Sequence, residues 1–244
     1  MKMQRKSTVA LTMLLCSMGW AHAQSAGQWK IGTGWFHVAP QSSGSPLTVT
    51  ALGQSTTVQG SSSKVGNADT FGITATYFLT DNFALETAIA KPPRLRLIGK
   101  GTLERLGEVG SAEIVSPSLL LQYHFLDSSA KLRPFVGAGL SYVKLSKVEL
   151  ANSISSGAFL RDPTRGSLLE GPTSASFTNS IAPVVSLGVN YNIDEHWSLG
   201  LSVSYTRLST RATLTTRSNV GDVISTTKAK INPIVSFLSV GYRF

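Results

Sequence analysis

The last segment of the chain, Ile234-Val235-Ser236-Phe237-Leu238-Ser239-Val240-Gly241-Tyr242-Arg243-Phe244, has two different faces. A β-strand points alternate side chains to opposite sides. The even-numbered positions are apolar except for Ser236 and finish in two aromatic residues, whereas the odd-numbered positions are mixed and finish in Arg243. A strand that faces lipid and ends at a membrane–water boundary has this pattern. The segment therefore predicts the closing strand of a transmembrane β-barrel.

The composition supports a membrane barrel over a soluble or helical membrane protein. Only 14% of the 244 residues are charged, against about 25% in soluble domains. Hydrophobic residues make up 42%, as expected when only alternate strand residues meet lipid. The net charge of +9 suits anionic lipid surfaces. Nucleic acid is not expected as a partner of an exported protein.

Residues 1–23 read as a cleaved secretory signal peptide. Lys2, Arg5 and Lys6 precede a largely apolar run, and Ala21-His22-Ala23 forms a cleavage signal. Cys16, the only cysteine, falls within this segment. We therefore expect residues 24–244 to form the barrel without disulfides, and the sequence names no metal or cofactor.

Eight segments alternate like strands, at 28–38, 70–79, 83–91, 118–125, 132–145, 180–193, 196–208 and 229–244. The connections between them alternate long and short, which is typical of outer-membrane barrels with short periplasmic turns and long extracellular loops. We predict an eight-stranded, antiparallel, up-and-down barrel that is integral to the bacterial outer membrane, with both termini in the periplasm. The Ser/Gly-rich stretch 41–66 in the first long connection is expected to be disordered.

The residues on the predicted outer face carry no charge, as lipid contact requires. Aromatic residues gather at the predicted periplasmic strand ends, where they would form an interfacial ring. They are Trp29, Tyr77, Phe83, Tyr123, Phe125, Tyr191, Trp197, Tyr242 and Phe244. The last two also serve as the expected signal to the outer-membrane assembly machinery.

The inward positions divide the lumen into two halves. The periplasmic half is polar, with Lys30, Glu86, Gln122, His124, Arg133 and Arg243. We expect Glu86 to pair with Arg133 or Arg243, because buried charges need partners. The outer half is apolar, with Phe36, Ala88, Ala90, Val143, Leu145, Val184 and Val235 as the expected substrate channel.

Three prolines, Pro92, Pro93 and Pro117, flank the third and fourth strands near their outer ends. Proline cannot donate to a β-ladder and lies at edges or interruptions. One hypothesis is a lateral opening in the wall, through which cargo leaves into the bilayer. The alternative is that these prolines only end strand pairing at the bases of the loops.

Three stretches together resemble the OmpW family of small outer-membrane barrels. They are Thr76-Tyr77-Phe78-Leu79-Thr80-Asp81-Asn82-Phe83-Ala84-Leu85-Glu86, Lys131-Leu132-Arg133-Pro134-Phe135-Val136-Gly137-Ala138-Gly139-Leu140-Ser141-Tyr142, and the terminal Gly241-Tyr242-Arg243-Phe244, with Trp197 after the third short turn. The resemblance implies an eight-stranded barrel with a narrow, largely apolar interior. It also implies passage of small hydrophobic molecules, in which some relatives are implicated. It is weak in the loops.

The expected function is passage of small hydrophobic molecules across the outer membrane, with lateral release as a hypothesis. The alternatives are a structural or surface-display barrel or receptor without transport, and a lipid A-modifying enzyme. An enzyme is not favoured, because the mature histidines His37, His124 and His196 assemble no nucleophile–base–orienter set. Expected partners are outer-membrane lipids and lipopolysaccharide, the latter through loop cations such as Arg94 and Arg96.

Overall fold

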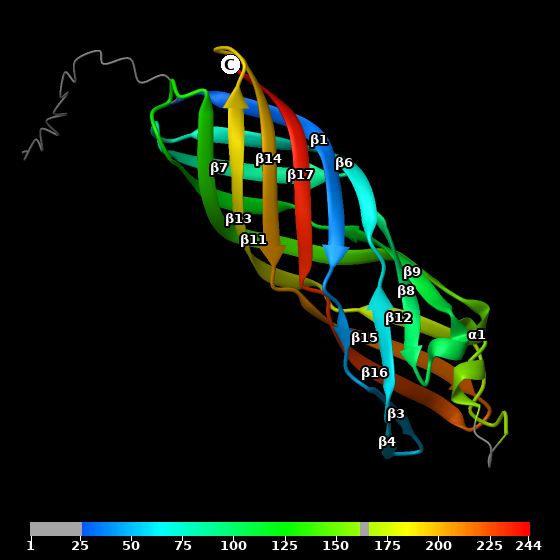
Figure 1. Cartoon of the computed structure of the whole chain (residues 1–244). Helices are drawn as coiled ribbons and strands as arrows, with labels where there is room; N and C mark the ends of the chain where they lie inside the picture. The colour runs from blue at the N-terminus through cyan, green and yellow to red at the C-terminus, as the bar shows by residue number, and fades with distance from the viewer. Residues whose placement is uncertain (1–25, 162–165) are drawn as a thin grey trace, which may run out of the picture.

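The computed structural model describes residues 26–161 and 166–244, so the predicted signal peptide lies outside the described residues. Eight strands form a closed barrel in which each strand pairs antiparallel with its neighbours along the chain (Figure 1). The strands are β1 (Trp29–Pro40), β6 (Ala68–Phe78), β7 (Phe83–Ala90), β10 (Ser118–His124), β11 (Leu132–Leu150), β13 (Ser180–Asn192), β14 (Trp197–Thr206) and β17 (Pro233–Arg243). The predicted fold is confirmed.

Pairing between the first and last strands closes the barrel. β1 and β17 pair from Lys30↔Arg243 to Pro40↔Pro233, and the Phe244 amide donates to the Trp29 carbonyl at 2.8 Å. The connections 79–82, 125–131 and 193–196 lie at this same end of the barrel, which we call the short-turn end. The opposite end, which carries the long connections, is the long-loop end.

The two faces of the barrel follow the predicted parity. Large apolar side chains of the barrel strands are exposed on the outside, and their inward neighbours are buried or partly buried. The aromatic ring at the short-turn end is built from contacting pairs. Trp29 and Tyr77 have ring centroids 4.9 Å apart, and Tyr242 lies 5.0 Å from Trp197 and 4.9 Å from Phe244. The outer surface therefore has the lipid-facing pattern that the sequence predicts.

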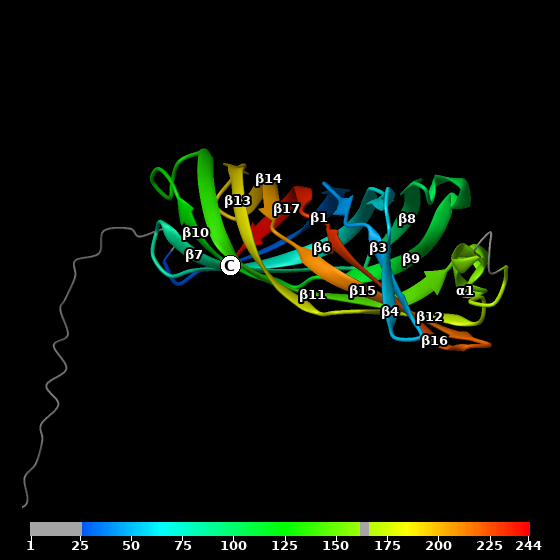
Figure 2. The same ribbon diagram turned by 90° about the horizontal axis from the view of Figure 1, so that it is seen from below.

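The long connections fold into a β-rich extension that continues along the barrel (Figure 1 and Figure 2). On one side, the end of β11 pairs with β9 (Glu108–Val115), then β8 (Arg94–Gly101) and β5 (Ser61–Val65). A second sheet contains β12 (Thr173–Phe177), β15 (Ser209–Ser218), β16 (Gly221–Lys230), β3 (Leu47–Ala51), β4 (Gln54–Val58) and β2 (Ser43–Gly44). Short helical turns are η1 (Glu104–Leu106), α1 (Asn152–Ser155) and η2 (Ala158–Leu160).

The expected disorder of residues 41–66 was wrong, because this stretch contains β2 to β5. β3 and β4 form a hairpin around Leu52 and Gly53, whose φ angles are 51° and 76°. Positive φ at both central residues is what a type I′ hairpin turn requires. The Thr- and Val-rich flanks favour strands, whereas the many Ser and Gly residues around them resemble a flexible linker.

A buried apolar cluster fills the junction between the barrel and the extension. It comprises Val65, Leu95, Ile114, Val143, Ala182, Leu208 and Ile231. Within residues 26–161 and 166–244, no helix has the length and apolar character that crossing a membrane requires.

Candidate binding cavity in the barrel

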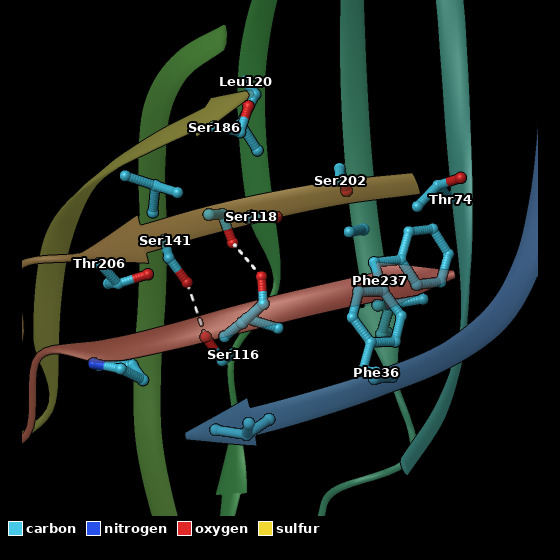
Figure 3. A pocket seen from close by; sticks show the side chains of 18 of the residues that line it. Phe36, Thr74, Ser116, Ser118, Leu120, Ser141, Ser186, Ser202, Thr206 and Phe237 are labelled. Atoms are coloured by element: carbon cyan, nitrogen blue, oxygen red, sulfur yellow. Dashed lines mark hydrogen bonds between the residues drawn. The ribbon is translucent and has the colours of Figure 1, made fainter. Parts of the chain in front are cut away.

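A cavity of about 150 Å³ occupies the lumen on the long-loop side of the polar residues (Figure 3). It exists because many inward positions carry small side chains, among them Ala88, Ala90, Ser118 and Ser186. Eight strands enclose only enough room for side chains or one small ligand, so small residues at these positions leave the space open. The cavity is therefore the candidate binding site.

The structure brings together most of the residues predicted to form the apolar half of the lumen. Phe36, Ala88, Ala90, Val143, Val184 and Val235 all line the cavity. Leu145 does not, because β11 continues beyond the barrel and pairs Leu145 with Ile114 of β9. It lines a second, smaller cavity in the extension, together with Leu95, Leu97, Phe177 and Ile231.

Sequence reasoning missed the hydroxyl groups as part of this site. The cavity is also lined by Thr70, Thr74, Ser116, Ser118, Ser141, Ser186, Ser202, Ser204 and Thr206. The alternation of residues along the strands showed that these side chains point inward, but small polar residues at such positions were interpreted only as filling the lumen. The cavity is thus apolar with a band of hydroxyls.

Aromatic rings form one wall of the cavity. Phe36 and Phe237, on the adjacent strands β1 and β17, stack with ring centroids 3.9 Å apart and an angle of 13° between their planes (Figure 3). The lack of a side chain at Gly72 leaves room for this pair, because a Cβ at that position would lie 2.7 Å from the Phe36 ring. The Phe36 ring therefore packs directly against the backbone at Gly72.

The predicted polar residues of the lumen close the cavity toward the short-turn end. Lys30 Nζ donates to Asn190 Oδ1 at 3.0 Å, and Thr76 Oγ1 donates to Glu86 Oε2 at 3.1 Å. Lys30 is also the cation that acts electrostatically on Glu86. Gln122 Oε1 lies 3.1 Å from His124 Nε2. We call Lys30, Glu86, Gln122, His124, Arg133, Asn190 and Arg243 the polar plug.

The expected pairing of Glu86 with an arginine was wrong. Arg133 Nη2 donates to the main-chain carbonyl of Asp81, and Arg243 Nη2 lies 3.5 Å from Asn192 Oδ1. Both guanidinium groups also approach the ring of Phe78, at 5.9 and 5.6 Å from its centroid. The arginines thus reach toward the short turns, and Lys30 is left as the cation that compensates Glu86.

The prolines Pro92, Pro93 and Pro117 lie at a break in the wall. The pairing of β7 with β10 ends at Ala88↔Ser118. The pairing of β8 with β9 begins at Arg94↔Glu113. A single bond, from the Ile114 amide to the Pro93 carbonyl at 3.1 Å, lies near the junction. We call the span between these two ladders the β7/β10 seam.

The cavity reaches this seam. Ile89 points outward and is 61% exposed, yet it lines the cavity together with Pro93. The cavity therefore borders the seam.

His124 belongs to the polar plug and does not line the barrel cavity. His124 packs between Phe78 and Phe135, with ring centroids 5.2 Å from each. Within the described ranges, no group of three His, Cys, Asp or Glu side chains could hold a metal ion.

A closed eight-stranded barrel with a lipid-type outer face and a narrow lumen defines a small outer-membrane β-barrel protein. The chain belongs to the OmpW family, whose family model matches residues 25–244. It is 30% identical to outer membrane protein W of Salmonella typhi over 244 residues, which is all of both chains. It is 28% identical to outer membrane protein AlkL of Ectopseudomonas oleovorans over 180 residues, covering 74% of this chain and 68% of that one.

A similar fold is found among solved structures. The crystal structure of OprG from Pseudomonas aeruginosa matches with a TM-score of 0.76 at 24% identity, covering 91% of this chain and 98% of that one. These comparisons place the protein in the outer membrane as an integral barrel.

Proposed function

We propose that the protein passes small hydrophobic molecules from the cell exterior into the outer membrane and releases them sideways through the β7/β10 seam. One observation carries this proposal: the apolar cavity is closed toward the short-turn end by the polar plug but borders the seam through Ile89 and Pro93. Family membership supports the cargo class, because some relatives are implicated in passage of such molecules.

The orientation follows from the lengths of the connections. The short-turn end, where β1 begins and β17 ends, would face the periplasm, and the extension would project outward, as in other outer-membrane barrels. Tyr242 and Phe244, in the aromatic ring, would be presented to the periplasmic assembly machinery. Failure of Phe244→Ala to slow assembly into membranes would contradict that role.

The path from outside begins in the extension. The second cavity there, about 20 Å³ in volume, is bordered by Leu95, Leu97, Leu145 and Ile231. Leu95 and Ile231 also belong to the buried cluster that separates it from the barrel cavity. The second cavity is also bordered by Ser42, Ser63 and Lys230, and movement of the apolar cluster would admit a hydrophobic molecule from there to the barrel cavity.

A pair of engineered cysteines tests the sideways exit. If the β7–β10 register continued across the seam, Ala90 would face Ser116, so Ala90→Cys with Ser116→Cys can tie the seam shut. Ala88→Cys with Ser118→Cys joins residues that are already paired and is the matched control, because all four residues line the cavity. The predicted mature chain holds no other cysteine.

The readout is toluene entry, followed by a toluene-responsive reporter in cells with and without the protein. Oxidation of the cysteine pair that spans the seam should abolish the protein-dependent signal, and reduction should restore it, with the control pair unaffected. A signal that survives the crosslink would remove lateral release alone. Equal signals with and without the wild-type protein would remove passage itself.

Surface display is the second candidate, favoured by the ordered extension. Its cations would meet lipopolysaccharide phosphates, but Arg94 is already engaged, with Nη1 2.5 Å from Glu149 Oε2 and Nη2 3.7 Å from Glu113 Oε1. Arg96 is therefore the better candidate. Unchanged co-purification of lipopolysaccharide with Arg96→Ala would argue against the contact.

We infer that His124 is not the base of a lipid A-modifying enzyme, because it is enclosed by aromatic rings and its ring contact is with Gln122; the remaining His–carboxylate contact, His37 Nδ1 with Asp69 Oδ1 at 2.7 Å, lies at the surface. An altered acyl-chain number in lipid A after overexpression would overturn this inference.

A further inference from the structure

Two lysines lie on the outer face of the barrel, one on each side of the β7/β10 seam. Lys91 comes two residues after Ile89, directly after β7, and Lys144 comes two residues after Tyr142 in β11. Alternate residues of a strand share a face. Because Ile89 and Tyr142 are exposed on the lipid side, the two lysine side chains leave the barrel on that side, and both lysines are exposed.

The strand register brings the two lysines close together. Lys144 pairs with Val115 of β9. On the other side of the same segment, the Ile114 amide donates to the Pro93 carbonyl, which brings Lys91, two residues before Pro93, opposite this segment. One strand thus separates the lysines. Adjacent strands lie about 4.8 Å apart, so the Cα atoms of the two lysines are roughly 10 Å apart.

Lys144 lies just beyond the apolar band of the barrel. The outward, even-numbered residues of β11 carry no charge from Leu132 to Tyr142. At a rise of about 3.3 Å per residue and a tilt of about 40°, this stretch spans roughly 25 Å along the membrane normal, which is the height of the apolar band of outer-membrane barrels. The long side chains of Lys144 and Lys91 can therefore place their ammonium groups at the level of the lipid headgroups.

Neither lysine forms an ion pair with an acidic side chain of the described residues, although other cations near the seam do. Glu113 of β9 is engaged by Arg94 at 3.7 Å and by Lys147 at 3.1 Å. Arg94 also contacts Glu149 at 2.5 Å. The carboxylates beside the seam are therefore taken by other cations, and the two lysines remain open to an anionic partner.

Exposed apolar side chains lie on the membrane side of the lysines. Ile89 of β7, Leu119 of β10 and Leu140 of β11 are all exposed, and Leu119 pairs with Leu140. A partner that fits this surface therefore combines anionic groups with long apolar chains. Lipid A, which forms the outer leaflet of the bacterial outer membrane, carries its phosphate groups directly above its acyl chains.

From these observations we propose that lipid A of lipopolysaccharide docks across the seam, with its phosphates on Lys91 and Lys144 and its acyl chains over Ile89, Leu119 and Leu140. The ammonium groups donate to the phosphate oxygens as charge-assisted hydrogen bonds. This surface differs from Arg96, which lies farther out on β8. The inference rests on the proposed orientation of the barrel but requires no passage of cargo.

Native mass spectrometry of the whole mature protein in detergent, titrated with deep-rough lipopolysaccharide, tests the inference. Lys91→Gln with Lys144→Gln should weaken binding about 5-fold per lysine and about 25-fold together, as expected for cations at an anionic lipid surface. Lys91→Arg with Lys144→Arg should retain binding. Lys131→Gln is the matched control and should change nothing, because Lys131 is an exposed lysine at the short-turn end.

Phosphatidylglycerol, which has a phosphate but no lipid A sugar, distinguishes the two lipid sources and should bind more weakly than lipopolysaccharide. Equal binding of the two lipids would overturn the assignment to lipid A. Unchanged affinity in the double glutamine variant, or an equal loss in Lys131→Gln, would overturn the site itself. These results are separate from passage of cargo, because the toluene reporter measures passage independently and lipid binding in detergent does not depend on orientation.

Discussion

A charge placed on the outer face should cost far more than the same charge on the extension. Leu201 is the fifth of the ten residues of β14, so it lies near mid-height of the membrane band, and its side chain is 52% exposed. An arginine at the bilayer midplane costs about 2–4 kcal/mol. Leu201→Arg should therefore shift the folding equilibrium toward the unfolded state by about 30- to 900-fold. Little packing is lost at such an exposed site, so the cost reports contact with lipid.

Reversible urea unfolding in lipid vesicles, followed by tryptophan fluorescence, measures this cost. Leu52→Arg is the matched control, because Leu52 is 75% exposed at the tip of the β3–β4 hairpin. That substitution should change the free energy of unfolding by less than about 0.5 kcal/mol. Equal effects of the two arginines would refute the assignment of the β14 outer face to lipid.

Three further predictions concern the lumen and the turns. Lys30→Met removes the bond from Lys30 Nζ to Asn190 Oδ1 and a positive charge that acts on Glu86, and it should cost about 1.5–3 kcal/mol in the same unfolding assay. The double variant with Glu86→Gln should cost less, and an equal cost would contradict the coupling. Phe237→Ala should cost about 3–5 kcal/mol and join the barrel cavity to a smaller polar one that Phe237 also borders; unchanged stability would contradict a packed stack. In the turn 193–196, amide donors from Trp197 and His196 hold the pKa of Asp194 below its usual 3.8. The protection of these two amides against hydrogen exchange should therefore persist above pH 3.8 and fall as the pH drops through the lowered pKa of Asp194. In Asp194→Asn, the protection should no longer depend on pH in this range.

The barrel could be predicted because its two environments restrict the residue type at alternate positions of each strand. Lipid outside and packed side chains inside force an alternation with a period of two, and β17 shows it from Ile234 to Phe244. The short turns then fixed the order of the strands. For the same reason, six of the seven predicted apolar lumen residues line one cavity.

The alternation of residues along a strand shows which face a side chain is on. It does not show how far along the barrel axis the residue lies or which residue it contacts. Leu145 has the inward parity of β11, yet it lies in the extension, because β11 runs on without a break from Leu132 to Leu150. Glu86 has the same limitation: its inward direction was clear, but long arginine side chains can reach along the barrel to oxygens near the turns. The extension itself was hidden, because its strands carry Ser and Thr where the barrel strands carry large apolar residues.

The direction of release follows from a comparison of costs. To leave toward the short-turn end, an apolar molecule would have to displace the bond from Lys30 to Asn190 and the bond from Thr76 to Glu86. Hydrogen bonds to charged groups are worth about 1.5–3 kcal/mol each, and the charges would be left facing an apolar solute. At the β7/β10 seam, no ladder pair joins residues 89–93 to 114–117 within the described chain. In the proposed lateral release, the molecule would pass the bond from the Ile114 amide to the Pro93 carbonyl and enter hydrocarbon directly, and this difference in cost supports that proposal.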